Sequence, residues 1–346
     1  MNDMAPQYDA VLLVSFGGPE GPDDVMPFLG NVLRGRDVPP ERVRQVAAHY
    51  DHFGGVSPIN GQCRDLIAAL REELGSRGPR LPVFWGNRNW HPMLADTLGE
   101  MAGKGVRRAL AFVTSAYSSY SGCRQYLQDI ERARAEVGSG APEVDKIRLY
   151  YNHPGFVEAL VERVGGAFER VPEPRRPEAR LVFTAHSLPR ALAATSEYQV
   201  QLEETAGLVA GALGREGWSL VYQSRSGPAS QPWLEPDIVD HLRALAAGGV
   251  GDVVVAPIGF VSDHMEVVYD LDLEAKSRAV ELGLNMVRAE TVGTHPRFVR
   301  MIRELILERL TDDPVRLYLG SRGPSPDVCP ADCCPPGARP APPRPD

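Results

Sequence analysis

The residues best suited to chemistry in this sequence are three carboxylates spaced four residues apart, Glu266, Asp270 and Glu274. On a helix this spacing places them on one side, where each like-charged pair destabilises an isolated helix by about 0.2–0.5 kcal/mol. A row of acids kept despite that repulsion indicates that a cation is handled there. A solvated helix face explains the pattern equally well, because nearby Asp263 also suits the positive end of a helix dipole.

A histidine at the end of another apolar segment favours the first interpretation. The run from Arg180 to Ala185 predicts a buried strand that leads directly into His186, and Pro189 then forces an extended or turning backbone. His186 is therefore expected at the carboxyl end of a strand, the edge at which open α/β sheets bind ligands. The acidic row follows another such strand, at 253–258. A lone histidine is more often structural, but opposite a carboxylate row it becomes a candidate base or metal ligand.

Five segments, in order along the chain, make the sequence resemble the ferrochelatases, which insert ferrous iron into a porphyrin. The resemblance is greatest to the actinobacterial branch that acts on coproporphyrin III. One such motif can arise by chance, whereas five in order make the resemblance specific. The segments are LVSFGGP at 13–19, GGVSPIN at 54–60, FTAHSLP at 183–189, YQSRSGP at 222–228 and PIGFVSDHME at 257–266.

The resemblance implies roles for the imidazole and the carboxylates. Iron insertion removes two pyrrole protons and strips water from ferrous iron, which is a substrate here. His186 and Glu266 match the family residues that accept protons or ligate iron, and the division of these two roles stays open. Asp270 and Glu274 would continue the row as a path for iron or protons, because hard oxygen ligands hold hydrated ferrous iron loosely.

The resemblance also implies residues that contact the porphyrin. Ser57 and Tyr126 match family positions at the metalloporphyrin. Phe16 stands where many Gram-positive relatives carry a tyrosine able to ligate the product iron; a phenyl ring cannot do so, which leaves the axial ligand open. Arg34, in an apolar segment at 27–36, suits a lip over a macrocycle whose carboxylates need cations. An ordinary amphipathic surface helix explains that segment equally well.

Composition describes an ordinary globular protein of 346 residues, 43% hydrophobic and 24% charged. A formal net charge of -8 argues against broad electrostatic binding to nucleic acid. No apolar run approaches the ~20 residues of a membrane span, and residues 1–6 lack the pattern of a signal peptide, so we expect a cytoplasmic protein. The segment 17–22 lacks the spacing and the amides of a dinucleotide loop, so no nucleotide cofactor is expected.

Alternating apolar strands and helical stretches predict an α/β fold with doubly wound parallel sheets. An internal repeat sharpens this prediction: Pro92 and Gly105 recur as Pro236 and Gly249, an offset of 144 residues in both cases. The dipeptide HP at 153–154 recurs at 295–296, an offset of 142. We expect two similar Rossmann-like domains, at 8–118 and 119–312, with a porphyrin cleft between them and a tail at 313–346.

The five cysteines do not resemble a disulfide framework, because their number is odd and three lie in the tail. Several relatives hold a 2Fe-2S cluster with three tail cysteines and one internal cysteine, and the resemblance implies Cys123, Cys329, Cys333 and Cys334 for these places. The adjacent pair at 333–334 is an awkward geometry, so Cys63 or another group remains an alternative ligand. A structural zinc or an unligated tail are further alternatives. Residues 335–346 are expected to be disordered.

These observations favour a coproporphyrin III ferrochelatase whose product is handed to a transient partner. Four alternatives stay open. They are a protoporphyrin IX ferrochelatase, a cobalt or nickel chelatase of a cobalamin or sirohaem pathway, a haem carrier without turnover, and an iron-sulfur sensor that has lost turnover.

Overall fold

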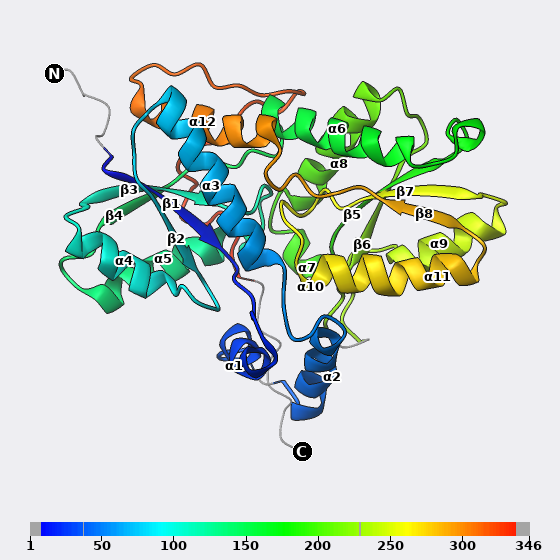
Figure 1. Ribbon diagram of the computed structural model, residues 1–346, viewed down its shortest axis with the longest axis horizontal. Helices are drawn as coiled ribbons and strands as arrows, with labels where there is room; N and C mark the ends of the chain where they lie inside the picture. Colours follow the sequence, from blue (N-terminus) through cyan, green and yellow to red (C-terminus); the bar gives the residue numbers. More distant parts are fainter. Residues whose placement is uncertain (1–7, 37, 228–229, 337–346) are drawn as a thin grey trace.

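Two parallel β-sheets of four strands each organise the chain (Figure 1). The computed structural model describes residues 8–36, 38–227 and 230–336. The strand order is β2-β1-β3-β4 in the first sheet and β6-β5-β7-β8 in the second, so both sheets have the same topology. The strands are β1 (Ala10–Ser15), β2 (Val83–Asn87), β3 (Arg108–Val113), β4 (Glu143–Lys146), β5 (Arg180–His186), β6 (Ser219–Gln223), β7 (Asp252–Ala256) and β8 (Asn285–Arg288).

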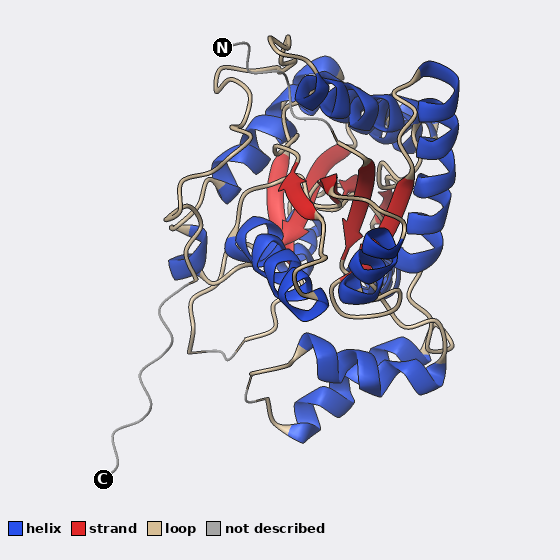
Figure 2. Ribbon diagram, turned by 90° about the vertical axis from the view of Figure 1, so that its left-hand side faces the viewer, coloured by secondary structure: helices blue, strands red, loops and turns tan. Residues whose placement is uncertain are grey.

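Helices cover both faces of the sheets, as the view of Figure 2 also shows. Those that begin before residue 150 are α1 (Pro22–Val32), α2 (Pro40–Asp51), α3 (Ile59–Arg77), α4 (Leu94–Gly103), the π-helix η1 (Tyr120–Arg124) and α5 (Gln125–Val137). The later helices are α6 (Pro154–Glu169), the 3₁₀ turn η2 (Glu173–Arg175), α7 (Arg190–Ala193), α8 (Tyr198–Ala212), α9 (Ile238–Ala247), α10 (Met265–Val267), the π-helix η3 (Val268–Ala275), α11 (Lys276–Glu281) and α12 (Pro296–Leu310).

The central strands are buried on both faces, which explains their unbroken apolar sequences. All of β1 and all of β7 are buried. Alternate residues of β1 belong to different cores: Val11 and Leu13 pack with α3, whereas Leu12 packs with α4 and α5. The expected α/β class with two similar Rossmann-like sheets is confirmed.

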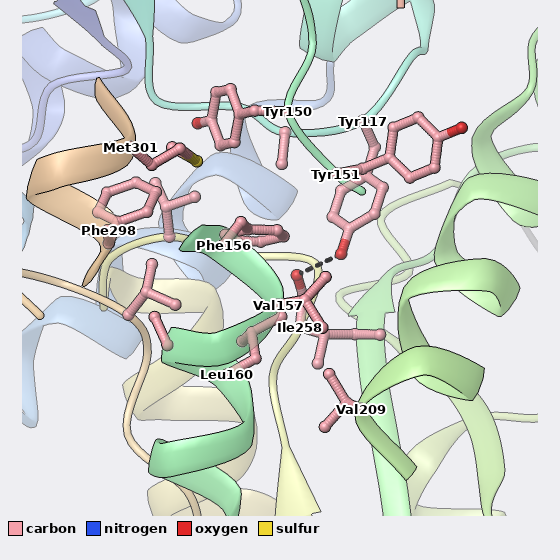
Figure 3. Close-up of a cluster of buried hydrophobic side chains, with 14 of the residues drawn as sticks. Tyr117, Tyr150, Tyr151, Phe156, Val157, Leu160, Val209, Ile258, Phe298 and Met301 are labelled. Atoms are coloured by element: carbon pink, nitrogen blue, oxygen red, sulfur yellow. Dashed lines mark hydrogen bonds between the residues drawn. The ribbon is translucent and has the colours of Figure 1, made fainter. Parts of the chain in front are cut away.

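Two equivalent helices are exchanged between the halves. α6 follows the first sheet in the chain but packs against β7 and β8 of the second. α12 follows the second sheet, but it packs on α3, and its Phe298 lies edge-on to Phe112 of β3 with ring centroids 6.1 Å apart. Figure 3 shows the buried cluster where these helices meet, with Phe156 and Met301 among its members. One continuous hydrophobic core therefore joins the halves.

The repeat seen in the sequence corresponds to repeated local structure. α6 and α12 both begin at a histidine-proline pair, and the imidazoles of His153 and His295 each accept the amide N–H two residues ahead. Such a cap satisfies one of the free N–H groups at a helix start. Pro92 and Pro236, 144 residues apart, both follow a cis peptide bond.

The expected boundary between residues 118 and 119 falls within the sequence of the first sheet. β4 pairs with β3, and α5 packs on α4, so both elements lie with the first sheet. By sheet membership the halves divide between Lys146 and Arg180. α12, expected in the second domain, covers the first sheet.

The expected tail is ordered as far as residue 336, and residues 337–346 lie outside the described part. Its segment after α12 is held by hydrogen bonds to the body: Asn152 donates to the carbonyls of Leu319 and Gly323, and Arg148 donates to that of Leu317. None of the helices in the described ranges combines the length and apolar character needed to cross a membrane.

Candidate functional site

His186 and Glu266 come together from two different elements of the second half. His186 ends β5, at the carboxyl edge predicted from its sequence, and Glu266 lies in the single turn α10 after β7. Imidazole Nε2 and carboxylate Oε1 are 3.3 Å apart. The side chains are 28% and 44% exposed, so the pair is accessible to a ligand while each group supports the other.

The pair is an ion pair at neutral pH. Burial lowers the pKa of His186, but the charge and hydrogen bond of Glu266, together with the Ser187 carbonyl and Asp270, raise it overall to about 9. Burial raises the pKa of Glu266, but the imidazolium outweighs it and brings the value to about 2. One proton is therefore shared by the two groups, and it must leave before His186 can accept another.

The acidic row continues from α10 into the π-helix η3, which carries Asp270 and Glu274. The sequence predicted a plain α-helix here; the wider π-turn, with its i to i+5 hydrogen bonds, still keeps every fourth residue near one side. The turn α10, which carries the first acid of the row, is capped by His264, whose Nδ1 accepts the N–H of Glu266 over 3.1 Å.

The carboxylates of the row influence one another. Burial raises the pKa of Asp270 to about 7; a hydrogen bond from Ser224 lowers it, and the charges of Glu266 and Glu274 raise it. The pKa of Glu274 is raised by burial and by Asp237. Glu274 also lines a surface pocket of about 440 Å³. The row thus extends from the ion pair to the protein surface, with a group able to change protonation near neutral pH inside it.

A loop after β6, which sequence reasoning matched only as a motif, touches the row directly. The buried side chain of Gln223 donates to the backbone carbonyl of Glu266. The hydroxyl of Ser224 donates to the carboxylate of Asp270. The last residue of the motif, Pro228, lies outside the described residues. No spacing rule in the sequence connects this loop with the acids; only the neighbouring positions of β5, β6 and η3 do.

The α1–α2 pair protrudes beside α10 and packs on it (Figure 1). Phe28 and Tyr50 form a small core with Met265, the residue before Glu266. On α2, the His49 ring stacks on Tyr269 of η3, with centroids 3.8 Å apart and planes within 5°. This pair of helices therefore rests directly on the acidic element, and sequence reasoning missed both histidine and tyrosine.

The four residues expected to contact a porphyrin lie in the first half. The Arg88 guanidinium lies over both the Phe16 and the Tyr126 ring, at 5.7 and 4.4 Å from their centroids, so the structure brings Phe16 and Tyr126 together. Ser57 is buried, and an added Cβ on Gly18 would lie 2.7 Å from its Cβ. Arg34 is exposed just after α1, where it donates to the Asn31 side chain over 2.8 Å.

The four cysteines expected as cluster ligands are neighbours, although the tail ones follow Cys123 by about two hundred residues. A hydrogen bond to Cys329 raises the pKa of the Cys123 thiol and lowers that of Cys329. Cys329 in turn bonds to Cys333, whose sulfur is 3.5 Å from that of Cys334. Cys63 is separate and buried, and burial raises the pKa of its thiol to about 11.

Arg124, next to Cys123, holds the tail cysteines in place. Its guanidinium donates to the backbone carbonyls of Pro330, Ala331 and Cys333. The thiol of Cys123 also interacts electrostatically with those of Cys333 and Cys334. Within the described residues, no three histidine, cysteine or acidic side chains are grouped so that they could hold a metal ion as they stand.

Comparisons with known proteins agree on one family. The family model described as ferrochelatase matches residues 8–310. A protein of Nocardia farcinica named coproporphyrin III ferrochelatase is 54% identical over 345 residues, covering 96% of this chain and 98% of the relative. A protein of Rhodopirellula baltica named ferrochelatase is 55% identical over 331 residues, covering 95% and 94%.

A solved structure shows the same fold at low identity. It is that of SirB from Bacillus subtilis with Fe³⁺, with a TM-score of 0.56 and 11% identity, over 86% of this chain and 96% of that one. At this identity the likeness concerns the arrangement of the chain alone.

Proposed function

The chain belongs to the ferrochelatase family, and we propose that it inserts ferrous iron into coproporphyrin III, giving coprohaem. As a metal chelatase it is a lyase. The observation that carries the proposal is the ion pair of His186 and Glu266, 3.3 Å apart at an accessible strand end and within two of the matched segments. The name of the Nocardia relative supports coproporphyrin III as the macrocycle.

The reaction exchanges two pyrrole protons for one ferrous ion, so the site must accept protons and deliver a cation. We infer that the His186–Glu266 pair faces the macrocycle and accepts the pyrrole protons. With the pKa of His186 near 9, the pair already holds one proton at neutral pH. Asp270, with a pKa near 7, is the group that can take this proton and pass it along the row.

Iron is proposed to arrive along the same row in the opposite direction. Glu274 opens onto the pocket of about 440 Å³, whose rim also includes Asp237 and Asp240. Carboxylate oxygens bind hydrated ferrous iron weakly enough to release it, which suits transfer of the ion rather than its storage. Asp270→Asn and Glu274→Gln should therefore raise the apparent KM for iron more than they lower kcat.

The porphyrin is proposed to lie against the first half. Phe16, which is partly exposed, offers aromatic surface to the macrocycle, and Tyr126 and Arg88 are buried behind it. Arg34 offers a cation to a propionate of the porphyrin. Ser57, in the buried turn beside Gly18, is proposed to contact the macrocycle. The α1–α2 pair, resting on Met265, would be the lip that closes over the ligand.

A 2Fe-2S cluster held by Cys123, Cys329, Cys333 and Cys334 is part of the proposal. Its support is that the four thiols are neighbours, although they come from two distant segments of the chain. Four thiolates could ligate such a cluster once their side chains rotate towards a common centre. The charge of Lys146 favours the thiolate forms of Cys123, Cys329 and Cys334, but the hydrogen bond to Cys329 and burial keep the pKa of Cys123 raised, and burial keeps that of Cys334 raised. When bound, such a cluster would cross-link the tail to the body.

The function is tested by anaerobic incubation of the full chain with ferrous iron and either coproporphyrin III or protoporphyrin IX. The change in the Soret absorption band measures metal insertion. Coproporphyrin III should be metallated in many turnovers and protoporphyrin IX poorly. Metallation of protoporphyrin IX alone would overturn the substrate. Metallation of neither would overturn the function, and tight binding of coprohaem with a single turnover would favour a carrier.

The cluster is tested separately on protein purified without oxygen. A brown protein with about two irons and two sulfides per chain is expected, and Cys123→Ser should remove the colour. Cys63→Ser is the matched control, because Cys63 is buried away from the other thiols. A colourless wild type made with ample iron and sulfide would refute the cluster, and stoichiometric zinc would favour a structural metal.

The cellular compartment and the transfer of the product are inferred together with the activity. We place the reaction in the cytoplasm, where coprohaem would pass to the next protein of haem formation through a transient contact. A stable complex is not required for this transfer, and a cell fractionation with the full chain checks the compartment.

A further inference from the structure

The last residue of β6 and the residue that follows it contact both parts of the site, and their role is not explained by the family resemblance. The amide N–H of Ser187, beside the catalytic imidazole, donates to the carbonyl of Gln223 over 2.8 Å. The side-chain amide of Gln223 donates to the carbonyl of Glu266. The end of β6 is thus hydrogen-bonded on one side to the strand end that carries the imidazole and on the other to the start of the acidic row.

The next residue, Ser224, reaches the middle of the row. Its hydroxyl donates to Oδ2 of the Asp270 carboxylate. A carboxylate accepts hydrogen bonds on both oxygens, so a donor fixed on one oxygen leaves the other free to meet a cation. Without that donor the carboxylate can rotate about its last bond, and its orientation has to be restored whenever a cation passes.

Ser224 makes this contact from a left-handed backbone conformation with φ of +63°. In the part of the chain that the structure describes, Cys334 is the only other non-glycine residue with a positive φ. Glycine adopts this conformation without strain, whereas a serine does so at a cost in stability. The backbone alone would therefore favour glycine. Compared with glycine, serine adds a hydroxyl group, and this hydroxyl donates its hydrogen bond to Asp270.

We propose that Ser224 is a positioning residue of the iron path, whose hydroxyl holds the Asp270 carboxylate in line between Glu274 and Glu266. The inference rests on the proposed function. Gln223 supports the same arrangement from the backbone side, where its amide fixes the turn that carries Glu266. Loss of the hydroxyl should weaken the use of iron and leave porphyrin binding largely unchanged.

Two substitutions separate this role from a structural one. Ser224→Gly removes the hydroxyl and relieves the strain, so the melting temperature should rise, while the apparent KM for iron should increase about tenfold, as for loss of one charged hydrogen bond. The KM for coproporphyrin should stay within about threefold of wild type. Ser224→Thr keeps the hydroxyl on a β-branched residue, so its melting temperature should fall while its KM for iron stays near wild type.

The control is Ser226→Gly, the same replacement at an exposed position of the same loop, which should leave the KM for iron unchanged. Anaerobic calorimetric titration of the porphyrin-free protein with ferrous iron gives a second measurement. If the wild type inserts iron and Ser224→Gly keeps the wild-type KM, the inference is overturned and the proposed function stands.

A wild type without insertion activity overturns the proposed function, and the iron titration then decides the inference: weaker binding by Ser224→Gly supports it, and equal binding overturns it. If Ser224→Gly does not fold, Ser224→Ala, which keeps the strain and lacks the hydroxyl, is measured in both assays with the same expected loss.

Discussion

The two halves place different side chains at equivalent positions of one framework. Leu13 of β1 and Phe183 of β5 correspond, because their partners on β3 and β7 lie 144 residues apart. Three residues further on, the first half presents Phe16 and the second presents His186. A phenyl ring therefore occupies in one half the strand end that carries the imidazole in the other.

The helices after the third strand of each sheet differ in the same way. Tyr126 and Asp270 are 144 residues apart, and each follows or lies in a π-helical turn, η1 or η3. In the first half Arg88 lies over the rings of Phe16 and Tyr126; in the second the loop at 223–224 bonds to the acidic row. π-turns are frequent at functional sites, and the two here are adjacent in the repeat: Arg124, the last residue of η1, corresponds to Val268, the first residue of η3.

The difference shows that the shared fold places residues at equivalent positions in both halves, and that the side chains at these positions give each half a different role. The partly exposed ring of Phe16, backed by the buried Tyr126 and Arg88, suits contact with a flat ligand, whereas an imidazole and carboxylates suit protons and cations. A ligand between the halves would meet a binding surface on one side and reacting groups on the other. Substitutions at equivalent positions should therefore have different kinetic signatures.

The largest effect is expected at the second strand end. His186→Ala should lower kcat by about 10²–10⁴-fold, because it removes the group proposed to accept pyrrole protons. The rate is measured with ferrous iron and coproporphyrin III at saturating concentrations of both. Circular dichroism and the melting temperature check that the fold is retained. A rate within about threefold of wild type would mean that the imidazole is structural.

A large shift is also expected in the acidity of that imidazole. Glu266→Gln removes the charge that holds the pKa of His186 near 9, and burial should then bring the pKa below its ordinary value of 6.5. Imidazole NMR signals of the metal-free protein follow the titration. A pKa that stays near 9 would show that another group carries the effect.

The same substitution has a predictable effect on stability. Since the folded pKa of His186 is raised and that of Glu266 is lowered, the ion pair stabilises the wild type fully between about pH 4.5 and 6.5, and this contribution is lost as the pH rises through 9. The difference in unfolding free energy between wild type and Glu266→Gln should therefore shrink as the pH rises from about 6.5 to 9. Denaturant titrations at several pH values measure it.

A smaller effect is expected at the first strand end. Phe16→Ala should raise the KM for coproporphyrin about tenfold, as for loss of one buried aromatic contact, and leave the KM for iron unchanged. Steady-state kinetics with each substrate varied in turn separate the two. An increase confined to the KM for iron would contradict the division between the halves.

The smallest effect concerns the tail beside the π-helix of the first half. Arg124→Gln loses the hydrogen bonds to three tail carbonyls and should lower the melting temperature by a few degrees. It should also speed proteolysis near residue 331. Arg132→Gln, an exposed arginine on the neighbouring helix, is the control. Unchanged proteolysis of Arg124→Gln would show that other contacts hold the tail.

Local patterns in the sequence were enough for the two-sheet fold, for His186 at a strand end and for the row at 266–274. The proximity of Phe16 and Tyr126 to one arginine depends on strand register, which no single segment carries. The π-helical form of the row was not predicted, and neither was the hydrogen bond of Ser224 to Asp270, which joins residues far apart in the sequence. The same holds for the tail, whose composition predicts disorder but whose carbonyls meet Arg124.

The exchange of α6 and α12 has a consequence for the synthesis of the chain. All strands of the first sheet have been made once Lys146 has left the ribosome, but one face of that sheet is covered by α12, which ends at Leu310. Until then the nascent first half exposes apolar surface that only a later segment can bury. A chain stopped before α12 should therefore aggregate or depend on chaperones, and the two halves should complete their folding together.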